Sequence, residues 1–186
     1  EGQVVDLGTV RKAIKQGLAY ATEDRKGAGL VLGDSITHNT SMANLGAVSK
    51  RWVMNELGET AVADGFRARL RIRSPDVTQS VEKLSGGNQQ KVVLGKWLFS
   101  NPKVLILDEP TRGIDVGAKY EIYGVVNQVV SEGRGVVMIS SEMPELLGTC
   151  DRIYVMNEGR FVGEFAIAEA SQEKIMHAIM KNEVIQ

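Results

Sequence analysis

Three short, almost entirely apolar runs in the second half of the sequence constrain the fold more than any other feature. They occupy residues 104–107, 136–139 and 153–156, and such runs are typical of strands covered on both faces of a sheet. The segment between the first two has helical periodicity and ends at glycines. Its apolar face is predicted to consist of Ala118, Ile122, Val125, Val126 and Val129. Strands that alternate with helices predict an α/β fold with a parallel sheet.

The first half of the sequence is expected to be mainly helical. Residues 9–16 read as a short helix and residues 18–21 as a buried strand. From 36 to about 73 the pattern is helical, because Val62, Phe66 and Leu70 recur every four residues and define one apolar face. Pro75 ends that region. A last helix is predicted over about 169–181.

Composition excludes several classes of protein. A chain of 186 residues with 43% apolar side chains can bury a core as one domain, with room for a small subdomain. No apolar run is long enough for a membrane helix, and the first residues do not resemble a signal peptide. A net charge of -1 predicts no attraction to nucleic acid. The single cysteine, Cys150, is expected to be a small core residue.

An acidic pair follows the run at 104–107 and predicts a site of metal-assisted chemistry. Asp108 and Glu109 would lie at the carboxyl edge of the parallel sheet, where such sheets bind ligands. Pro110 favours extended geometry at Glu109, so the two side chains would point opposite ways. We therefore expect Asp108 to hold Mg²⁺ and Glu109 to orient or deprotonate an attacking water. The alternative is a strand that simply ends in an acidic turn.

A second segment, residues 84–90 with the sequence LSGGNQQ, is here called the glycine loop. Ser85 is predicted to cap a helix, and Gly86 and Gly87 would let another backbone approach without a Cβ clash. Free amides at a helix N-terminus suit a terminal phosphate, although an ordinary glycine-rich cap is the alternative. The phosphate-cradling pattern G-x-x-x-x-G-K-[ST] occurs nowhere in residues 1–186. The sequence thus carries half of an ATP site.

The order and spacing of the glycine loop and the acidic pair resemble the signature and Walker B segments of the ABC-type ATPases. Further segments, EDRK at 23–26, TRGIDVGAK at 111–119 and SSEMPE at 140–145, are similar to those of one subgroup. That subgroup comprises the second nucleotide-binding domains of the double-domain ATPases that drive bacterial ribose, xylose and galactose importers. The resemblance implies an incomplete P-loop NTPase core with a parallel sheet and a small helical subdomain.

In that scheme the chain divides into three segments. Residues 1–34 belong to the ATPase core and contain the Q-loop region, and residues 35–83 form the helical subdomain. Residues 84–186 complete the core with the signature, Walker B, the D-loop and a degenerate switch region. The Walker A segment would precede Glu1, so the chain is expected to be a fragment of a longer protein. The implied cofactors are ATP and Mg²⁺.

The resemblance also implies roles for individual residues. Two nucleotide-binding domains would face each other, so that the glycine loop serves an ATP held by the partner domain. The residues assigned to nucleotide are Ser85, Gly86, Gly87, Asn88, Asp115 and Ser141. Asp115 matches the D-loop, with a helix N-cap as an equally compatible role. Glu23 stands at the position of the Q-loop glutamine, near Mg²⁺, and Ser141 at the position of the switch histidine. Both replacements predict a slow site beside Asp108 and Glu109.

The implied partners are a facing nucleotide-binding domain, membrane permease subunits and, indirectly, a periplasmic sugar-binding protein. The implied location is peripheral, on the cytoplasmic side of the bacterial inner membrane. Arginines alternate at 67, 69, 71 and 73, where solvated side chains are the favoured interpretation and a permease contact the alternative. Rival functions are a DNA-repair or chromosome-type ABC ATPase and a regulatory domain that binds nucleotide without turnover. The first is disfavoured because no long coiled-coil insertion precedes the glycine loop.

Overall fold

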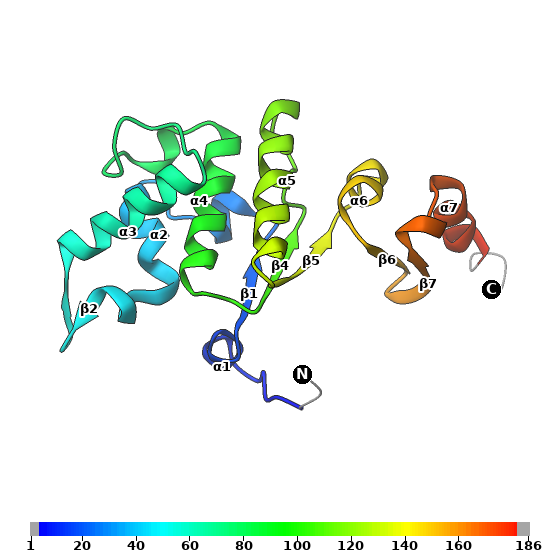
Figure 1. Cartoon of the computed structure of the whole chain (residues 1–186), viewed down its shortest axis with the longest axis horizontal. Helices are drawn as coiled ribbons and strands as arrows, with labels where there is room; N and C mark the ends of the chain where they lie inside the picture. Colours follow the sequence, from blue (N-terminus) through cyan, green and yellow to red (C-terminus); the bar gives the residue numbers. More distant parts are fainter. Residues whose placement is uncertain (1–3, 182–186) are drawn as a thin grey trace. The chain divides into compact units, whose positions relative to one another are not determined.

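The structure is a computed structural model that describes residues 4–181 and consists of two compact units (Figure 1). The first unit runs to Ile139 and the second begins at Ser140. The outermost residues of the predicted segments 1–34 and 84–186 lie outside the described residues. Within residues 4–181, no helix is long and apolar enough to cross a membrane.

A parallel three-stranded sheet forms the centre of the first unit. Its strands are β1 (Leu18–Ala21), β4 (Val104–Asp108) and β5 (Gly135–Ile139), in the order β1-β4-β5. In the register, Tyr20 lies opposite Ile106, and Asp108 lies opposite Ile139. The predicted parallel sheet is therefore confirmed for these three strands, and their carboxyl ends meet at one edge.

Two long helices pack against this sheet, namely α4 (Gly86–Phe99) and α5 (Val116–Ser131). Leu105 and Leu107 point to them and are almost fully buried, as are Leu94 and Ile122. In α5, Ile122, Val125, Val126 and Val129 are buried. The predicted apolar face of this helix is confirmed at these four positions.

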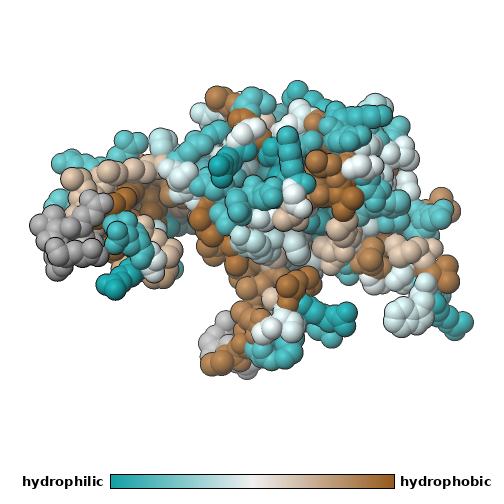
Figure 2. Space-filling view, turned by 180° about the vertical axis from the view of Figure 1, so that it is seen from behind, coloured by the Kyte–Doolittle hydropathy of each residue, from teal (hydrophilic) through white to brown (hydrophobic). Residues whose placement is uncertain are grey.

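The other face of the sheet is open, so the prediction that both faces are covered is wrong for the residues described. Tyr20, Val137 and Ile139 are 44%, 50% and 47% exposed. Alternate residues of a strand point to opposite faces, and only one face of this sheet meets the helices. Figure 2 shows the molecule from behind, where apolar surface is visible.

The predicted helical region contains more turns than expected. It consists of α2 (Ile36–Ser41), η2 (Met42–Val48), β2 (Ser49–Lys50), β3 (Val53–Met54) and α3 (Glu56–Arg69), and η3 (Val81–Lys83) follows it. The shorter elements before it are α1 (Val10–Lys15) and a one-turn π-helix, η1 (Arg25–Gly29). Residues 49–54 form an antiparallel hairpin that turns through Arg51 and Trp52, both with positive φ. A continuous helical pattern over 36–73 is thus wrong at this hairpin.

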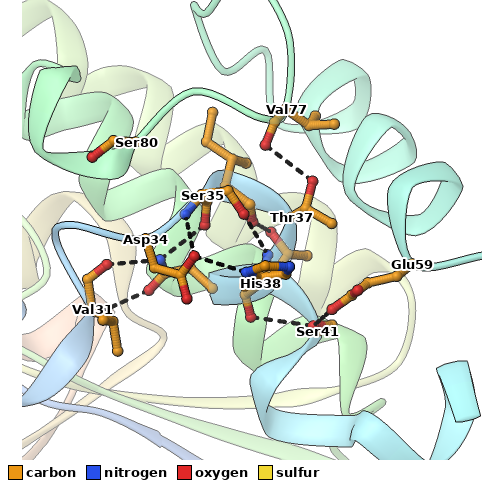
Figure 3. A network of polar contacts seen from close by, with 12 residues as sticks. Val31, Asp34, Ser35, Thr37, His38, Ser41, Glu59, Val77 and Ser80 are labelled. Carbon is orange, nitrogen blue, oxygen red and sulfur yellow. Dashed lines mark hydrogen bonds and ion pairs between the residues drawn. The ribbon is translucent and has the colours of Figure 1, made fainter. Parts of the chain in front are cut away.

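Polar side chains hold α2 in place within this region (Figure 3). Thr37 donates to the Val77 carbonyl at 3.0 Å, and Ser41 donates to the buried carboxylate of Glu59. Buried polar groups of this kind need such partners. Ile36 and Leu70 belong to the same hydrophobic cluster as the sheet. Residues 35–83 therefore share the hydrophobic core of the first unit, and the division into three segments stays a prediction.

The arginine run is only partly helical, because α3 ends at Arg69, and three of its four side chains form ion pairs. Arg67 contacts Asp64 at 3.1 Å, Arg69 contacts Glu132 and Arg73 contacts Glu121 at 3.2 Å. The last two pairs reach α5. Arg69, Arg71 and Arg73 are exposed, which confirms the favoured interpretation of solvated arginines for these three residues. The ion pairs of Arg69 and Arg73 also connect the helical region to the core.

The second unit contains an antiparallel hairpin and two helices. Its elements are α6 (Met143–Thr149), β6 (Arg152–Asn157), β7 (Arg160–Ala166), η4 (Ile167–Glu169) and α7 (Gln172–Lys181). The predicted strand at 153–156 exists, but it pairs antiparallel with β7, so its assignment to the parallel sheet is wrong. The turn through Glu158 and Gly159 has two positive φ angles, as a two-residue hairpin requires. Cys150 is half-buried beside this unit's core, and burial raises the pKa of its thiol.

Candidate functional site

The glycine loop leads directly into the N-terminus of α4. Ser85 occupies the N-cap position, as predicted, but its hydroxyl does not cap the helix. Instead the Asn88 side-chain amide donates to Ser85 Oγ at 2.9 Å, while Asn88 Oδ1 accepts from the Arg73 amide at 3.0 Å. The first amides of a helix have no acceptor within the helix. The Ser85 hydroxyl oxygen is therefore held at the start of α4 by the Asn88 amide.

The two glycines of the loop face different neighbours. A Cβ at Gly87 would lie 2.5 Å from the Cβ of Ala118, so this glycine lets α4 and α5 approach each other. A Cβ at Gly86 would lie 3.3 Å from both the Gly113 carbonyl and Arg25 Nη2. Within the chain, Gly86 is therefore approached by the Gly113 backbone and Gly87 by the Ala118 side chain, and the approach of a partner domain stays a prediction.

A cavity of about 200 Å³ opens where α4 and α5 begin. Its lining combines the glycine loop with the first turn of α5 and two charged side chains, namely Arg73, Ser85, Gly87, Asn88, Asp115, Gly117, Ala118 and Glu121. Asp115 caps α5, because its Oδ1 accepts from the Ala118 amide at 2.9 Å. The N-cap alternative is thus confirmed, and contact of Asp115 with a partner domain stays a prediction.

A buried lysine pairs with Glu121, one of the residues that line the cavity. The Lys91 side chain is only 2% exposed, and its Nζ lies 2.7 Å from Glu121 Oε2. It also donates to the Arg71 carbonyl at 2.9 Å. The hydrogen bond from Lys91 holds the pKa of Glu121 below its ordinary value. The pair connects α4 to α5 next to the glycine loop.

Asp108 ends β4 at the carboxyl edge of the sheet, as predicted, and Tyr20 holds its carboxylate. The Tyr20 hydroxyl donates to Asp108 Oδ2 at 2.7 Å, and this hydrogen bond raises the pKa of Tyr20. Sequence reasoning missed Tyr20. The contact follows from the strand register, which pairs Tyr20 with Ile106 on the strand face that also carries Asp108.

Glu109 adopts a left-handed conformation with φ 44°, so the prediction of extended geometry is wrong. Its amide donates to the Ile139 carbonyl at 2.8 Å, and its own carbonyl accepts from the Arg112 amide at 3.1 Å. The chain therefore turns sharply at the sheet edge, beyond the last strand residue. Such backbone conformations are concentrated at functional sites.

Glu23 follows β1 and lies at the same carboxyl edge as Asp108. It is exposed, and the Thr22 hydroxyl donates to its Oε2 at 2.9 Å, which lowers the pKa of Glu23. Mg²⁺ binds one or two carboxylates and keeps several waters, so the chemistry of Asp108 and Glu23 fits this ion. Ser141 is an exposed residue of the second unit. The predicted role of Ser141 beside phosphate stays a prediction.

Sequence comparisons relate the chain to proteins of sugar import. It is 54% identical to an L-arabinose transport ATP-binding protein of Geobacillus stearothermophilus, over 98% of this chain and 36% of that protein. It is 52% identical to a xylose import ATP-binding protein of Geobacillus kaustophilus, over 95% and 35%. A ribose import ATP-binding protein of Clostridium tetani is 46% identical, over 92% and 34%. The chain spans about a third of the length of these relatives.

Solved structures show the same fold. An ATP-binding cassette in its ADP conformation superposes with a TM-score of 0.69 at 18% identity, over 93% of this chain and 70% of that one. A dimeric cassette bound to ADP and Pi gives 0.72 at 18%, over 88% and 68%. The family model described as ABC transporter matches residues 5–112. Since this match covers more than half of the sequence, the chain belongs to the ABC transporter family of ATP-binding proteins.

Proposed function

We propose that the chain is the ATP-binding, energy-coupling part of a carbohydrate importer, and that its parent hydrolyses ATP between two facing domains to drive sugar uptake. The observation that carries the proposal is the glycine loop, whose amides and Ser85 hydroxyl open at the N-terminus of α4. The relatives are named as ATP-binding proteins of arabinose transport, xylose import and ribose import, which supports the substrate class.

The glycine loop serves a nucleotide held by the facing domain. Amides of Gly86, Gly87 and Asn88 donate to the terminal phosphate, and Ser85 adds its hydroxyl proton. The cavity beside them gives the loop a concave approach, and Asp115 lies at its edge. The similar cassette that was solved as a dimer bound to ADP and Pi supports the pairing of two such domains.

The sheet edge serves this domain's own nucleotide. Asp108 and Glu23 would hold Mg²⁺, which neutralises phosphate charge when bound. Tyr20 fixes the orientation of the Asp108 carboxylate through its hydrogen bond. Glu109 orients or deprotonates the attacking water, and Ser141 donates a hydrogen bond where a histidine would add positive charge.

The remaining partners are permease subunits, which receive the conformational change, and indirectly a periplasmic sugar-binding protein. The protein would therefore lie at the cytoplasmic side of the bacterial inner membrane, as a peripheral subunit. Sugar identity would be set by the other subunits rather than by this chain.

A reconstitution experiment tests this function. We expect the 186-residue chain alone to show no ATP hydrolysis, because it contains no G-x-x-x-x-G-K-[ST] loop. The two-domain parent, assembled with its permease in liposomes, should hydrolyse ATP faster when the loaded sugar-binding protein is added. Phosphate release is the measurement. Hydrolysis that never responds to a pentose-loaded or hexose-loaded binding protein would contradict the importer assignment.

Glu109→Gln should reduce turnover of the two-domain parent only slightly. General-base loss costs a factor of roughly 10² to 10⁴ at a site that limits the rate, but Glu23 and Ser141 make this site slow. The equivalent glutamine substitution in the first domain should cause most of that loss. The ratio of the two kcat values, measured under identical conditions, checks the expectation. Equal losses would mean that both sites turn over or are tightly coupled.

A further inference from the structure

Arg25 stands out among the arginines because it is partly buried and has no acidic partner. The structure contains three half-buried arginines in the described residues, namely Arg25, Arg67 and Arg134. Arg67 contacts Asp64 at 3.1 Å, and Arg134 contacts Glu132 at 3.6 Å. For Arg25, no ion pair or side-chain hydrogen bond occurs among residues 4–181, and its Nε is buried without a partner.

The guanidinium of Arg25 lies against the glycine loop. Its Nη2 is 3.3 Å from the position that a Cβ of Gly86 would take, and the Gly113 carbonyl is equally close to that position. Arg25 begins η1 directly after Asp24, whose carboxylate is used to cap the Gly27 amide at 2.8 Å. The arginine therefore reaches from the segment after β1 to the first residue of α4.

This placement is electrostatically unfavourable in the chain by itself. The N-terminus of a helix carries partial positive charge, and here it meets a cation that is partly removed from water. Burial lowers the pKa of Arg25, with no carboxylate near enough to oppose that shift. An oxyanion bound at the glycine loop would relieve both conditions, because it would pair with the guanidinium and accept from the free amides.

We propose that Arg25 is a further phosphate-binding residue of the glycine loop. Its guanidinium donates to the terminal phosphate group that the amides of Gly86 and Gly87 also bind. This inference deepens the proposed function and rests on it for the source of the phosphate. A bidentate, permanently charged donor is suited to this task, since five donor groups in a planar fork match the oxygens of a phosphate.

Titration of the 186-residue chain with inorganic phosphate tests the proposal, with the amide resonances of Gly86 and Gly87 as the readout. We expect saturable shifts for the original chain and about tenfold weaker binding for Arg25→Gln, the usual loss when a charged hydrogen bond is removed. Arg25→Lys should retain part of the affinity because the charge is kept. The matched control is Lys26→Gln, which removes the neighbouring exposed charge and should change binding less than twofold.

Several results would overturn the proposal. These are equal phosphate affinity in Arg25→Gln and the original chain, an equal loss in Lys26→Gln, or equal binding of acetate at matched ionic strength. Acetate binding would assign the arginine to a carboxylate instead. Amide spectra of each variant without phosphate establish that the fold is kept. The readout does not depend on hydrolysis, so a parent that failed to transport sugar would contradict the proposed function without touching this result.

Discussion

Gly86→Asp in the two-domain parent should reduce ATP turnover by about 10²-fold or more, while ATP binding at the site beside Asp108 changes little. The new Cβ would lie 3.3 Å from the Gly113 carbonyl and from Arg25 Nη2. The added carboxylate would occupy the position of the terminal phosphate and pair with the arginine that should bind it. Steady-state phosphate release gives kcat, and fluorescent nucleotide binding gives the affinity.

The control for this substitution is Gly86→Ala, which introduces the Cβ without the charge. At 3.3 Å the neighbours must move slightly, so we expect an intermediate loss of turnover. Thermal unfolding of both variants separates misfolding from a local effect. Activity that survives Gly86→Asp in a folded protein would show that the glycine loop does not serve the working site.

Lys91→Met should destabilise the chain by about 2 kcal/mol. Removal of one partner from a buried ion pair typically costs 3–5 kcal/mol, but the Glu121 side chain is 39% exposed and water would solvate part of its charge. The Arg71 carbonyl would also lose its donor. Urea unfolding of the 186-residue chain measures the difference. Arg73→Gln is the matched control, because its 81% exposed guanidinium pairs with the same carboxylate and should contribute little.

The Lys91 contact also predicts a dependence of stability on pH. The pKa of Glu121 is lower in the folded chain than its ordinary value of 4.5, so its contribution is fully present above pH 4.5. It is lost as the pH falls through the lower, folded value. In Lys91→Met, the loss of folding stability that comes from protonation of Glu121 at low pH should disappear. An unchanged acid limb, or a loss in Arg73→Gln as large as in Lys91→Met, would contradict this account.

The sequence predicts the central architecture well, because strands and helices of the core carry strong hydrophobic patterns. The run at 104–107 and the apolar positions of α5 leave little choice of structure. The hairpin at 49–54 is different, since its strands have two residues each and its turn uses Arg51 and Trp52. Neither residue is typical of positive φ, so no local signal marks the turn. The partner of β6 is likewise decided by tertiary contacts that a single run does not encode.

The sequence predicts the position of a site residue where a local motif defines it. It does not predict contacts between segments that are far apart in the chain. Ser85 and Asp108 occupy the positions that their motifs imply. The contact of Tyr20 with Asp108 joins residues 88 positions apart, and it becomes visible only once the register is known. Arg25 is similar, because its approach to Gly86 depends on the packing of η1 against α4. Glu109 shows a third case, in which a turn overrides the local bias of the following proline.

The contact between Gly87 and Ala118 couples the substitutions that these two positions can accept during evolution. With 2.5 Å between the Ala118 methyl and the place of a Cβ on Gly87, only one of the two residues can carry a side chain. An alanine at 87 becomes acceptable after 118 has changed to glycine, and the reverse order passes through a strained intermediate. Related chains should therefore have glycine at one of these two positions and alanine at the other. The distance between α4 and α5 would then be kept although neither residue is fixed.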